Sequence, residues 1–284
     1  MTQITIGGVP EHFNLPWHLA QSNKAFEKQN IDLKWIDYPG GTGDMCEALR
    51  TGDIDVAIIL TEGIIKDIVN GNPSKIIQTY VQSPLVWGIH VAHDSSYRTV
   101  DDLKGTTAAI SRMGSGSHLM AYINAEQNDW DIETDLKFNT IQNIEGALHG
   151  FENGTVDYFL WEKFMTKPFV DSGQLRRIGN CLSPWPCFVI AANQNMIERE
   201  PEALKDLLRI INEHSQDFKS IDHIEKVISE SYNLEIEDVE DWLKITEWSQ
   251  SLLDEPTIQK AQKHLYKLKI IPEIFEYEAL TASL

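Results

Sequence analysis

The stretch Gly40-Gly-Thr-Gly-Asp-Met-Cys-Glu-Ala-Leu-Arg-Thr-Gly-Asp-Ile-Asp-Val-Ala-Ile58 decides the fold class. Its glycine-rich loop at 40–43 precedes a helix that we expect Asp44 to cap and Gly52 to end. The run 55–60 that comes next is apolar and β-branched, which is typical of a strand buried on both faces. A helix joined to such a strand predicts one repeat of a helix-covered, mostly parallel sheet.

The same alternation extends outward from this stretch and forms two series. One series covers residues 1–84, and a second begins at 85, after which strand and helix signals restart. From residue 195 onward the strand signals stop, and the pattern predicts amphipathic helices near 201–218, 221–231, 235–250 and 255–267.

We therefore expect a two-lobed α/β fold. Lobe one is discontinuous and takes residues 1–84 plus 189–284, so that the C-terminal helices pack on it. Lobe two takes residues 85–188. The chain would cross between the lobes twice, and we expect the two crossings to act as a hinge.

Composition excludes several classes of function. The chain carries 24 basic and 43 acidic residues, a formal charge of −19. Such a surface repels phosphate backbones and anionic lipid, so we expect neither a nucleic-acid partner nor direct membrane contact. No apolar stretch approaches the ~20 residues of a membrane span.

The start of the chain and its cysteines bear on the cellular compartment. Met1 leads into the strand-like alternation 2–6 without the basic and apolar regions of a signal peptide. This predicts cytoplasmic residence, or a periplasmic one if a signal peptide has been removed. Cys46, Cys181 and Cys187 are an odd number and do not form a disulfide framework. A Cys181–Cys187 bridge and buried thiols both stay open.

Candidate site residues lie where strands end, because ligands of open α/β sheets bind at the carboxyl ends of the strands. In lobe one these candidates are His12, Asn14, Trp17, Gly40, Gly41, Thr42 and Thr61. In lobe two they are Ser111, Ser115, Gly116, Ser117, His118 and Trp161.

Several of these residues have structural alternatives that the sequence leaves open. Trp17 and Trp161 could pack in the core, and the glycines of the 40–43 loop could form an ordinary turn. Thr61 and Ser115 could serve as helix caps. The loop 111–118 carries the sharpest signal, because free N–H groups and hydroxyls at a helix N-terminus suit an anion.

No motif of bond-making chemistry appears in the chain. The histidines lack His-x-x-x-His spacing, and neither a Gly-x-Ser-x-Gly elbow nor a phosphate loop ending in Gly-Lys-Ser/Thr is present. We therefore expect recognition of a small molecule, with no metal, no cofactor and no catalytic residue.

The motifs resemble, in their order, those of ABC-transporter substrate-binding proteins with the type II periplasmic-binding fold. The similarity is to the nitrate, sulfonate and taurine branch and covers about residues 2–220. Besides 40–58, three segments carry it: Val100-Asp-Asp-Leu-Lys-Gly-Thr-Thr-Ala-Ala-Ile110, Gly114-Ser-Gly-Ser-His118 and Phe151-Glu-Asn-Gly-Thr-Val-Asp-Tyr158.

This resemblance implies that a small organic, anionic ligand binds in an interlobe cleft that closes about its hinge, without turnover. The resemblance places the 114–118 segment where such proteins bind the anionic end of a ligand. An ABC permease would be a partner only if the protein is exported. The chain looks closest to a small cytosolic, fungal and bacterial offshoot of the branch.

The alternative is a thiamine-pyrimidine-synthase-like enzyme or a binder of a pyridoxal-phosphate-type ligand, from the same branch. Those synthases carry a Cys-Cys-Cys-Phe-Cys run. Here Cys181 and Cys187 are separated by Leu-Ser-Pro-Trp-Pro, which departs from that pattern.

Overall fold

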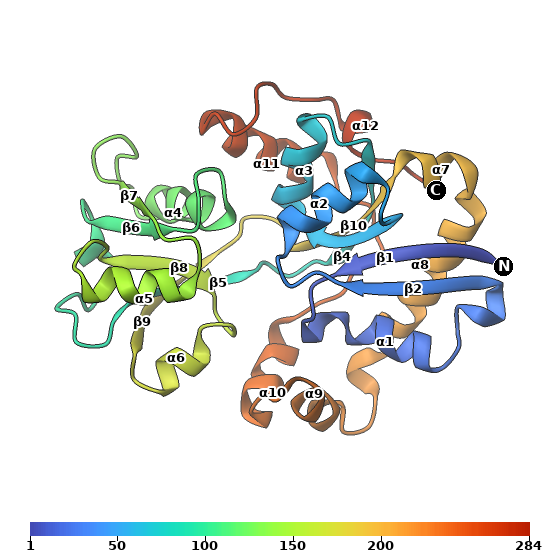
Figure 1. The fold of residues 1–284 in the computed structure, drawn as a ribbon, viewed down its shortest axis with the longest axis horizontal. Coiled ribbons are helices and arrows are strands. Elements are labelled where there is room, and N and C mark those ends of the chain that lie inside the picture. The colour runs from blue at the N-terminus through green and yellow to red at the C-terminus, as the bar shows by residue number, and fades with distance from the viewer. The chain divides into compact units, whose positions relative to one another are not determined.

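The computed structural model describes all residues, 1–284, and the chain forms two compact units (Figure 1). Unit 1 comprises Met1–Ser83 and Trp185–Leu284, and unit 2 comprises Pro84–Pro184. The chain therefore passes from one unit to the other twice. The two α/β units, with the C-terminal helices belonging to unit 1, match the expected fold class.

Unit 1 is built on a five-stranded sheet of order β2-β1-β3-β10-β4. Strands β1, β2 and β3 run parallel, whereas β10 is antiparallel to both of its neighbours, β3 and β4. The strands are β1 (Thr2–Gly8), β2 (Ile31–Asp37), β3 (Val56–Leu60), β4 (Ser74–Val81) and β10 (Phe188–Asn193).

Helices cover both faces of this sheet. Figure 1 shows α2, α3 and α11 on one side and α1 with α8 on the other. The helices of unit 1 are α1 (Leu15–Ser22), α2 (Thr42–Thr51), α3 (Thr61–Val69), α7 (Gln194–Arg199), α8 (Pro201–Gln216), α9 (Ile224–Tyr232), α10 (Ile236–Ile245), α11 (Glu255–Lys267) and α12 (Tyr277–Leu280). Short 3-10 turns are η1 (His12–Asn14), η2 (Glu27–Gln29) and η4 (Phe218–Ser220).

Unit 2 repeats the plan with a sheet of order β7-β6-β8-β5-β9. Helix α4 lies on one side of it and α5 on the other (Figure 1). The elements are β5 (Val86–Ala92), η3 (Asp101–Leu103), β6 (Thr107–Ile110), α4 (Gly116–Gln127), β7 (Lys137–Thr140), α5 (Ile144–Glu152), β8 (Tyr158–Glu162), α6 (Lys167–Asp171) and β9 (Leu175–Leu182). Here β6, β7 and β8 are parallel, and β5 is antiparallel to β8 and β9.

The returning strand β10 stabilises the centre of unit 1. All six of its residues are buried, and it lies between β3 and β4. Burial on both faces requires a continuous apolar run, which Phe188–Ala192 supplies. Asn193, at the end of β10, caps α7 by accepting a hydrogen bond from the N–H of Met196 at 2.8 Å.

Helices α2 and α3 approach closely because Gly63 has no side chain. A Cβ added at Gly63 would lie 2.3 Å from Cγ2 of Thr42, well inside van der Waals contact. The methyl group of Thr42 thus occupies the space over Gly63. This packing fixes the start of α2 against the first turn of α3.

Two local predictions are wrong. Helix α2 begins at Thr42 with Gly41 at its N-cap, so Asp44 lies in the first turn and is not the cap. Helix α10 ends at Ile245, not at 250, because the chain then pairs with the edge of β4. Each sheet is mostly parallel, as expected, and has one antiparallel strand, β10 in unit 1 and β5 in unit 2.

Three further features bear on function. All three cysteines are free and buried, so the buried-thiol alternative describes this structure. No group of His, Cys, Asp or Glu side chains is placed to hold a metal ion. None of the helices combines the length and the apolarity that crossing a bilayer would require.

Candidate ligand-binding site

The N-terminus of α4 in unit 2 brings together five of the candidate residues. Ser115 is the N-cap of α4, and its Oγ accepts a hydrogen bond from the N–H of His118 at 3.3 Å. The Oγ of Ser117 accepts one from the N–H of Ser111 at 2.9 Å and lies 3.1 Å from the Oγ of Ser115. Ser111, Ser115, Gly116, Ser117 and His118 therefore form one cluster, which we call the α4 loop.

Two backbone donors of the α4 loop have no acceptor within the protein. The first N–H groups of a helix lack intrahelical acceptors. Neither the backbone nor a side chain of the protein accepts a hydrogen bond from the N–H of Gly116 or Ser117. The helix dipole adds a partial positive charge at the same place, worth roughly 0.3–1 kcal/mol for an anion.

His118 is held in one orientation by this loop. Its Nδ1 accepts a hydrogen bond from the N–H of Gly114 at 3.0 Å, and its ring packs edge-on against Tyr122 and Phe138. Burial lowers the pKa of His118, so the neutral ring carries its proton on Nε2. That buried Nε2–H has no acceptor within the protein.

Two neighbours of the α4 loop were absent from the sequence-based candidates. Trp87, on β5, lies over the loop, because a Cβ added at Gly116 would lie 3.1 Å from its indole. Arg112 is exposed and forms no ion pair. A lone cation within the loop sequence could have been recognised from the chain, but the approach of Trp87 depends on the sheet order.

Trp161 does not belong to the α4 loop in this structure. It packs against an apolar cluster that includes Phe159 and Leu175, together with the side chains of α5 and α6. Trp161 is half-buried there, which is closer to the packing alternative left open from the sequence.

The candidates of unit 1 separate into buried and exposed residues. Asn14 is fully buried and donates from Nδ2 to the carbonyl oxygen of Val9 at 2.9 Å. Trp17 is 1% exposed and lies among Phe26, Trp35 and Tyr80. Both side chains therefore contribute to the core.

Thr61 is also fully buried. Its N–H donates to the carbonyl of Cys187 at 3.1 Å, and its hydroxyl donates to the carbonyl of Pro186. It therefore holds the segment that returns to unit 1, and capping of α3 by its side chain does not occur.

His12 and the loop Gly40–Thr42 remain near the surface of unit 1. The ring of His12 lies 4.2 Å from that of Trp242, edge to face, and burial lowers the pKa of His12 to about 4. Gly41 has φ of +73°, which glycine adopts without strain. The N–H groups of Thr42 and Gly43 open α2, where Asp44 adds a negative side chain.

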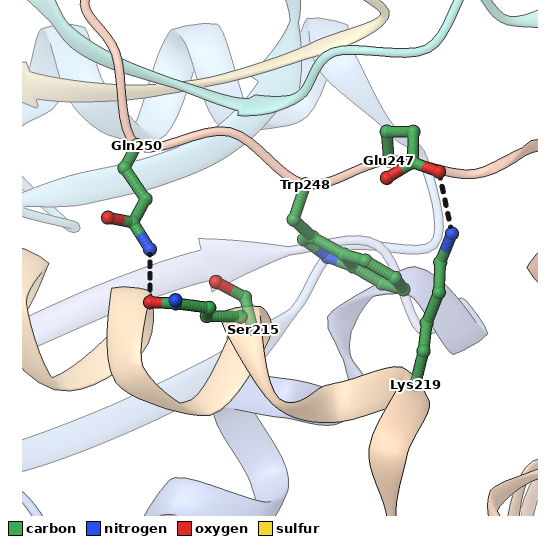
Figure 2. Close-up of a pocket in the computed structure, with 6 residues that line it drawn as sticks. Ser215, Lys219, Glu247, Trp248 and Gln250 are labelled. Atoms are coloured by element: carbon green, nitrogen blue, oxygen red, sulfur yellow. Dashed lines mark hydrogen bonds and ion pairs between the residues drawn. The ribbon is translucent and has the colours of Figure 1, made fainter.

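A hollow of about 410 Å³ in unit 1 contains none of the candidate residues. Figure 2 shows the side chains that line it. Several of the side chains that line this hollow form an ion pair or a hydrogen bond with each other. Lys219 Nζ lies 2.8 Å from Glu247 Oε1, and Gln250 Nε2 donates to Gln216 Oε1 at 3.2 Å. These polar groups already have partners, whereas Nε1 of Trp248 in the same lining is buried without an acceptor.

Comparison with known proteins shows which proteins this chain is similar to. A family model described as Ca3427-like PBP matches residues 87–181, which lie in unit 2. A relative from Escherichia coli (strain K12), named for the binding of aliphatic sulfonates, is 29% identical over 184 residues, which cover 61% of this chain and 54% of the relative. A Bacillus subtilis (strain 168) relative of the same name is 24% identical over 242 residues, 84% of this chain and 72% of that one.

Among solved structures, the Candida albicans CA3427 gene product, described as having the generic periplasmic binding protein fold, is 25% identical with a TM-score of 0.85. The match covers 98% of this chain and 93% of that one. In sequence and in fold the chain therefore resembles ABC-transporter substrate-binding proteins of the sulfonate-binding kind. The sulfonate-binding protein SsuA of E. coli shares the fold, with a TM-score of 0.76 at 18% identity over 100% of this chain and 94% of that one.

The matches to substrate-binding proteins do not extend over the whole of each relative. The chain spans about half the length of the E. coli relative that it matches, 54%.

Proposed function

We propose that this protein binds a small organic anion of the sulfonate class and releases it unchanged. The observation that carries the proposal is the pair of N–H groups of Gly116 and Ser117 that no protein atom accepts, at the start of a buried helix. The names of the E. coli and B. subtilis relatives supply the ligand class.

The anionic group would occupy the α4 loop. Backbone N–H groups at a helix N-terminus suit an oxyanion, and the hydroxyl of Ser111 could donate to a further oxygen. Arg112 would attract the anion to a protein whose formal charge is −19. The aliphatic or aromatic part of the ligand would meet the Trp87 indole, which is 7% exposed.

In unit 1 we assign ligand contacts to His12 and to the loop Gly40–Thr42, because these remain accessible. Asn14 and Thr61 take structural roles because their side chains donate to backbone carbonyls, and Trp17 does so because its ring packs among Phe26 and Tyr80.

None of the comparisons supports the enzyme alternative. The chain also lacks the Cys-Cys-Cys-Phe-Cys run of those synthases. Binding without turnover is therefore the function that the site supports best.

A calorimetric and thermal-shift panel tests the proposal. It would contain methane-, ethane- and butanesulfonate, sulfate and nitrate, with chloride salts at equal ionic strength as controls. An organic sulfonate at a hundredfold excess over its Kd should stabilise the fold by about 2.7 kcal/mol. The ligand should be recovered unchanged by mass spectrometry. If no sulfonate binds, or if the ligand is consumed, the proposal fails.

A further inference from the structure

His118 closes the N-terminus of α4 with two reciprocal hydrogen bonds. Its N–H donates to Oγ of the N-cap, Ser115, at 3.3 Å, and its Nδ1 accepts from the N–H of Gly114 at 3.0 Å. In the usual capping box, a Ser or Thr N-cap accepts from the third helical residue, and a Glu or Gln side chain at that third position accepts a backbone N–H at the cap. The α4 loop therefore holds a capping box in which a histidine takes the place of Glu or Gln.

The same bonds fix the shape of the α4 loop. The N–H of Ser115 donates to the carbonyl of Arg112 at 3.2 Å, which closes a turn in which Gly114 has φ of +72°. His118 holds this turn against the helix through its bond to Gly114. The two N–H groups that we assign to the anion follow directly, at the first and second positions of α4, so their directions depend on this turn.

The imidazole of His118 accepts from Gly114 as a neutral group. The residue is 3% exposed, and its ring packs edge-on against the rings of Tyr122 and Phe138, with centroids 4.9 Å and 4.8 Å away. Burial lowers the pKa of His118 and raises the pKa of Tyr122, so both side chains are neutral at pH 7. The box is thus closed by an acceptor that carries no charge.

Acidic residues open most of the other helices. Of the nine helices with eight or more residues, seven carry Asp or Glu in the first turn, where the helix dipole favours a negative side chain, and only α1 and α4 carry none. This absence contrasts with the 43 acidic residues of the chain. A Glu at the third position of α4 would also close the box, but its carboxylate would lie beside the N–H donors and repel an anion.

We infer that His118 is a positioning residue for the anion: its imidazole holds the α4 loop through Gly114 without placing a negative charge beside the bound anionic group. The imidazole acts through the backbone that it holds and does not itself contact the ligand. The inference rests on the proposed function, because a capping box without charge has this purpose only where an anion binds.

Titration calorimetry of ethanesulfonate with three substitutions tests this role. His118→Gln keeps a neutral acceptor at the third position, and we expect a Kd within about threefold of the wild-type value. His118→Glu keeps the acceptor but adds the charge, which should weaken binding about tenfold or more while the melting temperature stays near that of wild type. His118→Leu removes the acceptor in the same apolar surroundings, and it should weaken binding about fivefold.

Gln174→Glu is the matched control for the added charge. Gln174 is exposed in the same unit, and it precedes Leu175, which pairs with Ala92 at the end of β5 that is remote from Trp87. The substitution adds the same carboxylate far from the α4 loop and should keep the wild-type Kd.

Hydrogen exchange of the Gly114 amide, measured by NMR without ligand, reports on the capping box itself. Exchange should be faster in His118→Leu than in wild type and should stay unchanged in His118→Gln and His118→Glu. If wild type binds no sulfonate, the proposed function fails, and this arm alone decides whether His118 holds the loop.

Three results would overturn the positioning role while the proposed function stands. Wild-type affinity in His118→Glu would show that a charge at this position does not act on the anion. Equal losses of affinity in His118→Gln and His118→Leu would mean that the imidazole itself contacts the ligand. A wild-type exchange rate of the Gly114 amide in His118→Leu would mean that the ring does not hold the loop.

Discussion

The indole Nε1 of Trp185 donates a hydrogen bond of 2.8 Å to the Oε2 atom of Glu62. Trp185 is the first residue of unit 1 after the chain leaves unit 2, and Glu62 lies in the first turn of α3. Both side chains are buried, at 2% and 6% exposure. Together with Thr61, which binds Pro186 and Cys187, this pair fixes the returning segment to unit 1.

Trp185→Phe should lower the free energy of unfolding by about 1–3 kcal/mol, because it leaves a buried carboxylate without its donor. Chemical denaturation measures this. Trp35→Phe is the matched control, since Trp35 donates at 2.8 Å to the exposed Asp37, where water can replace the indole. The double variant Glu62→Met/Trp185→Phe should recover part of the loss. Equal losses in the two Trp→Phe variants would contradict the role of the buried pair.

Gly63→Ala should destabilise the protein, although alanine is the better helix former. The new Cβ would meet Cγ2 of Thr42 at 2.3 Å, and we expect a loss of roughly 1–3 kcal/mol. Thr42→Ser removes that methyl group. Thermal denaturation of Gly63→Ala with and without Thr42→Ser should therefore show rescue in the double variant. Additive losses would mean that the two residues do not pack as described.

Glu11→Gln should make the ligand-free protein more stable at high pH. The pKa of Glu11 is raised from 4.5 to about 7 in the folded state, so between these values the fold holds a proton that the unfolded chain has lost. Wild-type stability therefore falls as pH rises through this window, and the variant lacks this contribution. The variant-minus-wild-type difference should increase by roughly 1–3 kcal/mol between pH 4 and pH 8.

Denaturant titrations at both pH values provide the measurement, repeated with Glu273→Gln as the control because Glu273 is an exposed carboxylate of the same unit. A difference that stays flat with pH would show that Glu11 is solvated like an ordinary surface carboxylate.

The fold class was predictable from local pattern, because the apolar run 55–60 and the helix before it need no distant partner to be recognised. The structure of the segment after Ile245 could not be predicted in this way. Trp242, Ile245 and Ser249 continue a helical spacing, yet the N–H of Ser249 donates to the carbonyl of Tyr80 and the N–H of Thr79 donates to Ser251. Pairing with the edge of β4 outweighs the local preference, and it joins residues far apart in sequence.

In the candidate site, too, local sequence predicts some residues, whereas the surroundings of others depend on distant segments. Ser115, Gly116 and Ser117 could be predicted, since a strand, a Gly/Ser loop and a helix succeed one another directly in the chain. The surroundings of His12 could not be predicted. Its ring meets those of Tyr232 and Trp242, which come from helices more than two hundred residues away, and no spacing rule links them.

The most direct test of anion binding at the α4 loop is titration calorimetry of ethanesulfonate with Ser115→Asp and with Asn143→Asp. Aspartate caps helices as well as serine or asparagine, so the melting temperatures should stay close to that of wild type. Ser115→Asp places a carboxylate in the α4 loop, whereas Asn143→Asp places one at the N-cap of α5 in the same unit. We predict at least a tenfold loss of affinity in Ser115→Asp and wild-type affinity in Asn143→Asp. Wild-type affinity in Ser115→Asp would show that the α4 loop only caps its helix and does not hold the anion.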